Sequence, residues 1–192
     1  MAVLILGLVL FLGVHSVRIV APQWRLSMLE RLGEQGWKGL YTVVSLAGFA
    51  LLVWGYSLAR LSPTWLWVSP AWTYHVTALL MLVAFILLAA AYVPGNRIKA
   101  KLGHPMLLAT KTWAFAHLLS NGTLADLVLF GSFLVWAIAD FAVSRRRDRT
   151  EGVTYPVLGI GRDAAAIVVG VVAYVVFALW LHGLLIGVRP FG

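Results

Sequence analysis

Apolar residues recur along this chain in runs of about 20, separated by short polar or basic segments. A helix needs ~20 apolar residues to cross the ~30 Å hydrocarbon core of a bilayer. Because backbone groups in lipid must be paired within their own segment, the runs predict helices rather than isolated strands. We expect about six membrane-spanning helices, over residues 2–21, 38–59, 72–93, 104–120, 123–143 and 164–187.

The composition agrees with lipid as the solvent. Hydrophobic residues make up 61% and charged residues 11% of the 192 positions, which is too apolar for a water-soluble protein. We therefore predict an all-α, polytopic membrane helix bundle, with residues 1–192 forming a single membrane domain. The first run lacks a basic segment before it and a small-residue cleavage pattern after it, so it is interpreted as a retained helix.

Basic residues lie mostly in the loops after the first, third and fifth predicted helices. These loop regions hold Arg18, Arg25, Arg31, Lys38, Arg97, Lys99, Lys101, Arg145, Arg146, Arg147, Arg149 and Arg162. An excess of Lys and Arg marks the cytoplasmic side, so both termini are predicted to lie outside the bacterial inner membrane. Topology and anionic headgroups explain the formal net charge of +8, and we expect no nucleic-acid partner.

Two cytoplasmic segments have a distinct pattern. Residues 22–37 place Trp24, Met28 and Leu32 at helical spacing with charged residues between them, which favours an amphipathic helix on the membrane surface. The alternative is a solvated connector. Residues 144–163 are predicted to form a basic cytoplasmic loop.

Histidines within the spans carry the candidate chemistry, because ionisable residues in a membrane are costly and are functional candidates by default. The chain has five histidines and no cysteine. Disulfides, thiolate metal sites and covalently attached haem are therefore excluded, whereas imidazoles from different helices can hold haem iron non-covalently. No nucleotide-binding loop, zinc-protease or serine-hydrolase motif is present.

Five segments resemble those of one family. They are GLVLFLGVHSVRIVAPQWR from Gly7, RLGEQGWKGLYTVVSLAGF from Arg31, AAAYVPGNRIKA from Ala89, HPMLLATKTWAFAHLLSNGTLADLVLFGSFLVWA from His104 and WLHGLLIGVRP from Trp180. In this order they closely resemble the NnrU family of bacterial membrane proteins, which is associated with denitrification through nitrite and nitric oxide reduction. More distantly, the chain is similar to 15-cis-zeta-carotene isomerase, an integral membrane enzyme that uses haem b.

The resemblance implies a haem b cofactor and either redox chemistry or isomerase-like chemistry on a lipophilic substrate. The alternative that it implies is a non-enzymatic assembly or maturation partner of nitrite or nitric oxide reductase. The axial histidines of the isomerase correspond to His15 and His117, and His104 matches a further family histidine. The isomerase has a cysteine where this chain has Ala114, so a switch to a thiolate ligand is excluded here.

Helical spacing separates the histidines of the fourth predicted span. On a straight helix His104 and His117 lie ~20 Å apart and ~140° apart around the axis, so they cannot bind one iron together. Lys111 shares the face of His104, and Trp113 shares that of His117. We interpret the face with His117 as the ligand face, while His104 is equally well explained as a residue beside the site or at the interface.

The predicted depth of each histidine in the membrane leaves other pairs of haem ligands possible. The predicted topology places His15 inward and His117 outward of the midplane, ~10 Å apart along the normal. The depth-matched pairs are His15 with His104, and His117 with His182 or His75. Among these, His182 is the best substitute ligand because it lies in a matched segment.

Two cations lie close to these histidines in the sequence. Lys111, near the middle of its span, requires an anion or a water-filled cavity, and the candidates are Asp126, Asp140 and a haem propionate. Arg18, three residues after His15, is expected to meet either a propionate or the cytoplasmic headgroups.

Overall fold

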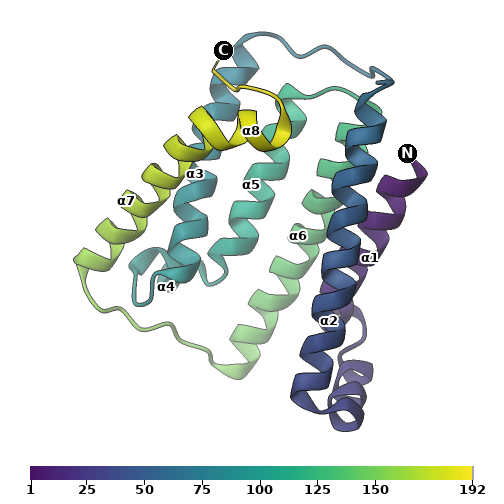
Figure 1. The fold of residues 1–192 in the computed structure, drawn as a ribbon. Coiled ribbons are helices and arrows are strands. Elements are labelled where there is room, and N and C mark those ends of the chain that lie inside the picture. Colours follow the sequence, from purple (N-terminus) through teal and green to yellow (C-terminus); the bar gives the residue numbers. More distant parts are fainter. Residues whose placement is uncertain (192) are drawn as a thin grey trace. The chain divides into compact units, whose positions relative to one another are not determined.

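The computed structural model describes residues 1–191, which are helical outside short connections (Figure 1). The helices are α1 (Ala2–Val20), α2 (Pro22–Arg60), α3 (Trp72–Tyr92), α4 (Arg97–Leu102), α5 (Pro105–Ser120), α6 (Leu124–Glu151), α7 (Ile160–Val176) and α8 (His182–Ile186), with a π-helical segment η1 (Phe177–Leu181) between the last two. The prediction of an all-α membrane bundle is confirmed.

Within residues 1–191, five helices are long and apolar enough to cross a membrane: α1, α2, α3, α6 and the continuous segment Ile160–Ile186. The fourth predicted span is α5, which has 16 residues and is therefore ~24 Å long. It is shorter than the ~30 Å hydrocarbon core. Length and composition alone thus support five of the six expected crossings.

The chain divides into two compact units. The first unit contains residues 1–68 and 122–136, and the second contains residues 69–121 and 137–191. The first half of α6 belongs to the first unit and its second half to the second unit.

In the first unit, glycines hold α1 directly against α2. A Cβ built on Gly48 of α2 would lie 2.7 Å from a backbone nitrogen of α1, and Cβ atoms on Gly7 and Gly55 would overlap the backbone of the facing helix. Small residues let membrane helices approach closely, and van der Waals packing then holds them together. The two helices therefore form a tight antiparallel pair.

The amphipathic segment at the start of α2 is helical but is separated from the long span by a break. Gly33 has φ 69°, a left-handed conformation that favours glycine, and it interrupts α2. The indole of Trp24, before the break, meets the buried Trp37, after it, edge to face at 5.8 Å between ring centroids. The segment is thus folded back beside the long helix (Figure 1).

In the second unit, α3 packs against both α5 and α7 (Figure 1). A Cβ on Gly170 of α7 would lie 2.6 Å from the Cα atom of Ile86, so this contact is also at backbone range. On the other side, the Thr77 hydroxyl donates to the Ala116 carbonyl across 2.9 Å. The fully buried Asn96 caps α4 by accepting from the Lys99 N–H.

The predicted basic loop 144–163 is helical over its first half. The structure continues α6 to Glu151, so four of the five arginines of this segment lie on α6. The fifth, Arg162, lies on α7, and the connection without helix is 152–159. Arginine favours helix, and the chain leaves the helix at Gly152, whose φ is 65°.

Hydrogen bonds join the connection that follows α3 to the connection that follows α6. The Leu158 N–H donates to Gly95 O across 2.9 Å, and the Arg97 N–H donates to the Asp163 carboxylate across 2.6 Å. The connection after α3 therefore lies on the same side of the bilayer as the connection after α6. Because α6 is long enough to span, we expect the shorter α5 to cross as well, as the sixth helix.

Candidate functional site

His15 lies on α1 of the first unit, half-buried among aromatic rings. Its ring centroid is 4.3 Å from that of Phe11, 5.2 Å from that of Tyr41 and 6.2 Å from that of Trp136. Its Nδ1 lies 2.6 Å from the Phe11 carbonyl oxygen. Because a carbonyl only accepts, Nδ1 carries the proton and the lone pair of the neutral imidazole is on Nε2.

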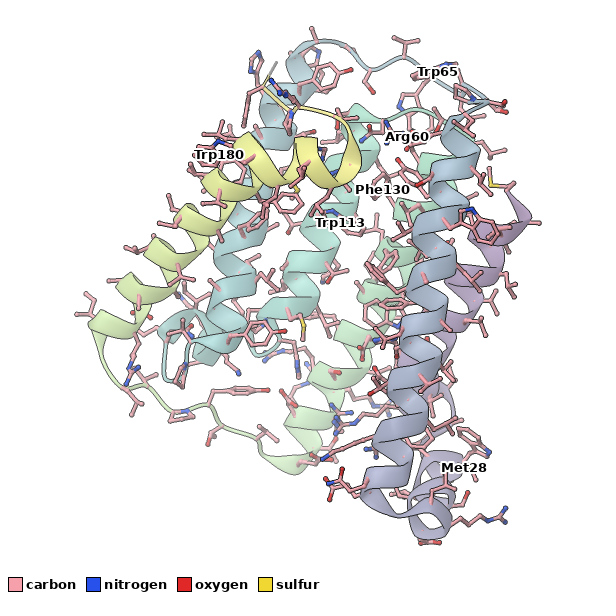
Figure 2. The ribbon with its side chains drawn as sticks, in the orientation of Figure 1. Met28, Arg60, Trp65, Trp113, Phe130 and Trp180 are labelled. Atoms are coloured by element: carbon pink, nitrogen blue, oxygen red, sulfur yellow. The ribbon has the colours of Figure 1, made fainter. Side chains whose placement is uncertain are left out.

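His117 repeats this arrangement on α5 of the second unit. Its Nδ1 is 2.9 Å from the Trp113 carbonyl oxygen, and the two rings lie 5.5 Å apart. The prediction that Trp113 and His117 share a face is confirmed, and Figure 2 shows Trp113 on this helix. The neighbouring Ala114 and Ala116 are fully buried. The Nδ1 atom of His117 therefore carries a proton, as in His15.

His182 directly follows the π-helical segment η1. Its Nδ1 lies 2.6 Å from the Val188 carbonyl oxygen, and its ring meets that of Phe177 edge to face at 5.8 Å. Single π-helical turns inside α-helices are rare and frequently accompany functional sites. The nearby Trp180 is largely exposed, consistent with its outward position in Figure 2.

His104 has a different environment from the other three histidines. It occupies the N-cap position of α5 without a side-chain capping bond. Its Nε2 lies 2.9 Å from the Asp148 Oδ2, although the ring N–H is not aligned with that oxygen. The Tyr155 hydroxyl donates to the same oxygen across 2.8 Å. Burial, followed by the hydrogen bond to Asp148, raises the pKa of Tyr155 above its usual value. The Nε2 of His104 therefore faces a carboxylate, which supports a role beside the site rather than as an iron ligand.

Lys111 and His104 meet the same aromatic ring. The Lys111 Nζ lies 3.8 Å from the centroid of Phe141, and the His104 ring lies 6.4 Å from it. This confirms that the two residues share a face of α5. No carboxylate of residues 1–191 lies within salt-bridge distance of Lys111, and the ammonium is instead stabilised by a cation–π contact.

The two aspartates considered as partners of Lys111 form other bonds. In the second unit, Asp140 accepts from the Ser144 hydroxyl at 3.1 Å. In the first unit, the buried Asp126 accepts from the Tyr56 hydroxyl at 2.6 Å and from the Thr123 hydroxyl at 2.6 Å, and its own N–H donates to Thr123. Thr123 and Asp126 thus form a capping box at the start of α6, and the Asp126 carboxylate is part of that cap.

Arg18 lines a cavity beside His15. This space, called the basic cavity below, has a volume of about 350 Å³ and is lined by His15, Arg18, Arg25, Glu34, Lys38 and Tyr41, among others. Every one of these residues belongs to the first unit. The cavity is thus lined both by His15 and by Arg18, for which the sequence left open a haem propionate or the lipid headgroups as partner.

The predicted site residues therefore fall into local groups. His15 lies with Arg18 at the basic cavity, His104 lies with Lys111 around Phe141, and His117 lies against Trp113. His75, at the start of α3, is exposed, as expected for an interfacial residue. Among residues 1–191, no three or more His, Asp and Glu side chains are grouped to hold a metal ion.

Sequence reasoning missed Asp148 and Tyr155 beside His104, because these partners lie 44 or more positions away in the sequence. It also did not foresee that Arg25 and Lys38 would line one space with Arg18. A sequence signal did exist for the second case, namely the glycine at position 33 inside a helical pattern, which marks a possible break.

A comparison with protein families identifies this chain. The family model described as NnrU protein matches residues 3–190, which includes all of the segments discussed above. Searches of curated proteins and of solved structures returned no significant match. Since the family model covers nearly the whole chain, this membrane protein belongs to the NnrU family.

Proposed function

We propose that this chain is a haem b-binding protein of the bacterial inner membrane, in which His15 and His117 are each a ligand of haem iron, and that it acts in redox chemistry linked to denitrification. The observation that carries the proposal is the state of the two imidazoles. Each donates its Nδ1–H to the carbonyl oxygen four residues earlier. Histidines that bind metals characteristically donate the other ring N–H in this way, which sets the tautomer and the ring orientation.

The surroundings of both residues suit a flat, apolar group. Rings of Phe11, Tyr41 and Trp136 flank His15, and small alanines neighbour His117. Aromatic and small apolar neighbours of this kind suit the hydrophobic surroundings of a haem. When bound, haem supplies a one-electron redox centre. Because residue 114 is alanine, no thiolate is available beside His117, so we favour redox chemistry over isomerisation.

The visible spectrum of the purified protein tests the proposal. Full-length chain, produced in a haem-replete host and purified in detergent, is expected to show a Soret band. His15→Ala and His117→Ala should each abolish or shift that band, and added imidazole should restore part of it by replacing the missing ligand. His75→Ala is the matched control, because His75 is exposed at the start of α3, and its spectrum should equal that of the unaltered protein.

Two outcomes would contradict the proposal. One is a folded, helical protein with no Soret band after growth with haem. The other is a Soret band that neither histidine variant changes. A haem-free protein that co-purifies with nitrite or nitric oxide reductase would instead favour the assembly role.

A further inference from the structure

The basic cavity draws its positive charges from three separate stretches of the first unit. Arg18 comes from the last turn of α1, Arg25 from the amphipathic segment, and Lys38 from the long helix after the break at Gly33. Without that break, the amphipathic segment would continue along the axis of α2 and would carry Arg25 away. The fold therefore assembles this group of cations, which are spread over 21 positions of the sequence.

The charges at the cavity are not balanced by the protein. Glu34 is the carboxylate among its lining residues, and it already accepts a hydrogen bond of 2.6 Å from Lys38. Within residues 1–191, neither Arg18 nor Arg25 has a carboxylate within 4 Å. Two guanidinium groups thus line one space without a counter-charge, an arrangement that repulsion disfavours and that a bound anion would stabilise.

The chemistry of the lining indicates which anion fits. Guanidinium groups present a planar fork of N–H donors that matches the oxygens of a phosphate. The cavity also has a hydroxyl donor in Tyr41 and an apolar wall that includes the buried Trp37. An apolar wall beside a cluster of phosphate donors suits a ligand that is polar at one end and apolar at the other.

The location of the cavity indicates the source of the phosphate. It lies where α1 leaves its apolar run, next to an amphipathic helix with exposed Trp24 and Leu26. A helix of this kind lies at the level of the lipid headgroups. The surrounding basic residues mark this side as cytoplasmic, and the cytoplasmic leaflet carries anionic lipids that attract such residues.

We propose that the basic cavity binds the headgroup phosphate of an anionic phospholipid, with Arg18 and Arg25 as the phosphate ligands and Lys38 as an additional positive charge. This inference does not rest on haem, since the cavity and its cations are formed by the protein alone. The bound lipid would hold the amphipathic segment against α1 and so stabilise the surroundings of His15.

Native mass spectrometry of the full-length, haem-free protein tests this proposal. After delipidation, the protein is titrated in detergent with phosphatidylglycerol, with phosphatidylcholine, or with inorganic phosphate. We expect one tightly retained phosphatidylglycerol, and weaker retention of phosphatidylcholine, whose headgroup has no net charge. The double variant R18Q/R25Q should lose about tenfold or more in affinity for phosphatidylglycerol, because it removes charge-assisted hydrogen bonds.

Matched variants separate a specific site from general basic charge. Arg31→Gln removes one charge from the same amphipathic segment, at an exposed position that does not line the cavity, and its affinity should equal that of the unaltered protein. Arg25→Lys keeps the positive charge but removes the planar fork of N–H donors. The affinity of this variant for phosphatidylglycerol should therefore be intermediate. This variant also provides the test if the double variant does not fold, as judged by its circular dichroism.

Three results would overturn the proposal. Equal retention of phosphatidylglycerol and phosphatidylcholine would show that the cavity does not select a headgroup with net negative charge, contrary to the proposed anionic phospholipid. Equal losses in Arg31→Gln and in the cavity variants would show only diffuse attraction. Complete displacement of phosphatidylglycerol by inorganic phosphate would assign the cavity to a soluble phosphate.

Discussion

At the residue scale, the nitrogen that carries the proton decides what each histidine can do. His15 and His117 donate Nδ1–H to a carbonyl of their own helix, whereas His104 has its Nε2 next to a carboxylate. The first arrangement leaves the lone pair of the neutral ring on Nε2, and the second directs that nitrogen to the protein. Three histidines of one chain thus fall into two arrangements, according to what each ring nitrogen faces.

The bond between Tyr155 and Asp148 gives a prediction about stability. Tyr155→Phe removes the hydroxyl that donates to the carboxylate of Asp148, which is 8% exposed. A buried acceptor that loses its donor costs roughly 1–3 kcal/mol of unfolding free energy. We expect a lower midpoint of thermal unfolding in detergent.

Tyr74→Phe is the control for this prediction, because Tyr74 is 55% exposed, and its midpoint should not change. The Soret band of the haem-loaded Tyr155→Phe protein should also be unchanged. A shifted band would mean that the His104 cluster takes part in holding haem.

At the scale of elements, backbone-range contacts between helices explain why particular glycines occur in the spans. Between α1 and α2 the apolar side chains face lipid as readily as they face protein, so hydrophobic burial gives little attraction. Close approach at Gly7, Gly48 and Gly55 provides it through van der Waals contact instead. This pair of helices also supports His15 and the basic cavity, so its packing matters for both proposed sites.

Gly48→Leu tests this packing. Its Cβ would meet the backbone of α1, which cannot move aside as a flexible side chain can. Overpacking of this kind typically costs about 1–3 kcal/mol. We expect a lower melting temperature and loss of the haem spectrum at growth temperature.

Gly13→Leu is the matched control, since a Cβ at Gly13 meets nothing within 4 Å. It adds the same side chain to α1 and should leave stability almost unchanged. Equal destabilisation by both variants would mean that the packing of α1 on α2 is not the cause.

At the scale of the whole molecule, hydrogen bonds between distant connections define the topology. At one side, Leu158 and Arg97 join the connections that follow α6 and α3. At the other side, Trp65 and Thr123 form a β-bridge between the connections that precede α3 and α6. Figure 2 shows Trp65 in the connection after α2. We therefore expect each pair of connections to lie in one compartment, and we predict that α5 and α6 cross the membrane as a return pair.

Cysteine labelling tests this topology, and the chain is well suited to it because it contains no cysteine. Single variants Lys101→Cys and Thr154→Cys place a thiol at exposed positions in the two bonded connections. Both should react with a membrane-impermeant maleimide only after the inner membrane is opened. Ser62→Cys, after α2, should react in intact spheroplasts. Labelling of residues 101 and 154 from opposite sides would show that α5 does not cross.

Much of the fold follows from local pattern. Apolar runs of membrane length predicted the helices, because lipid leaves the backbone few other ways to satisfy its polar groups. The shared faces of His104 with Lys111, and of Trp113 with His117, followed from helical geometry and are confirmed. The start of the basic loop could not be predicted from the apolar pattern, because α6 continues to Glu151, beyond the end of the apolar run.

The amino-acid sequence alone therefore determined the membrane environment, the all-helical class and the family of this protein, since each depends on composition and on order along the chain. The tertiary structure decided which carboxylate faces His104 and which cations share one cavity. Those properties depend on partners far apart in the sequence, such as His104 with Asp148 and Arg18 with Lys38. A break at one glycine and close packing at a few others bring these partners together, and no local pattern of residues specifies such distances.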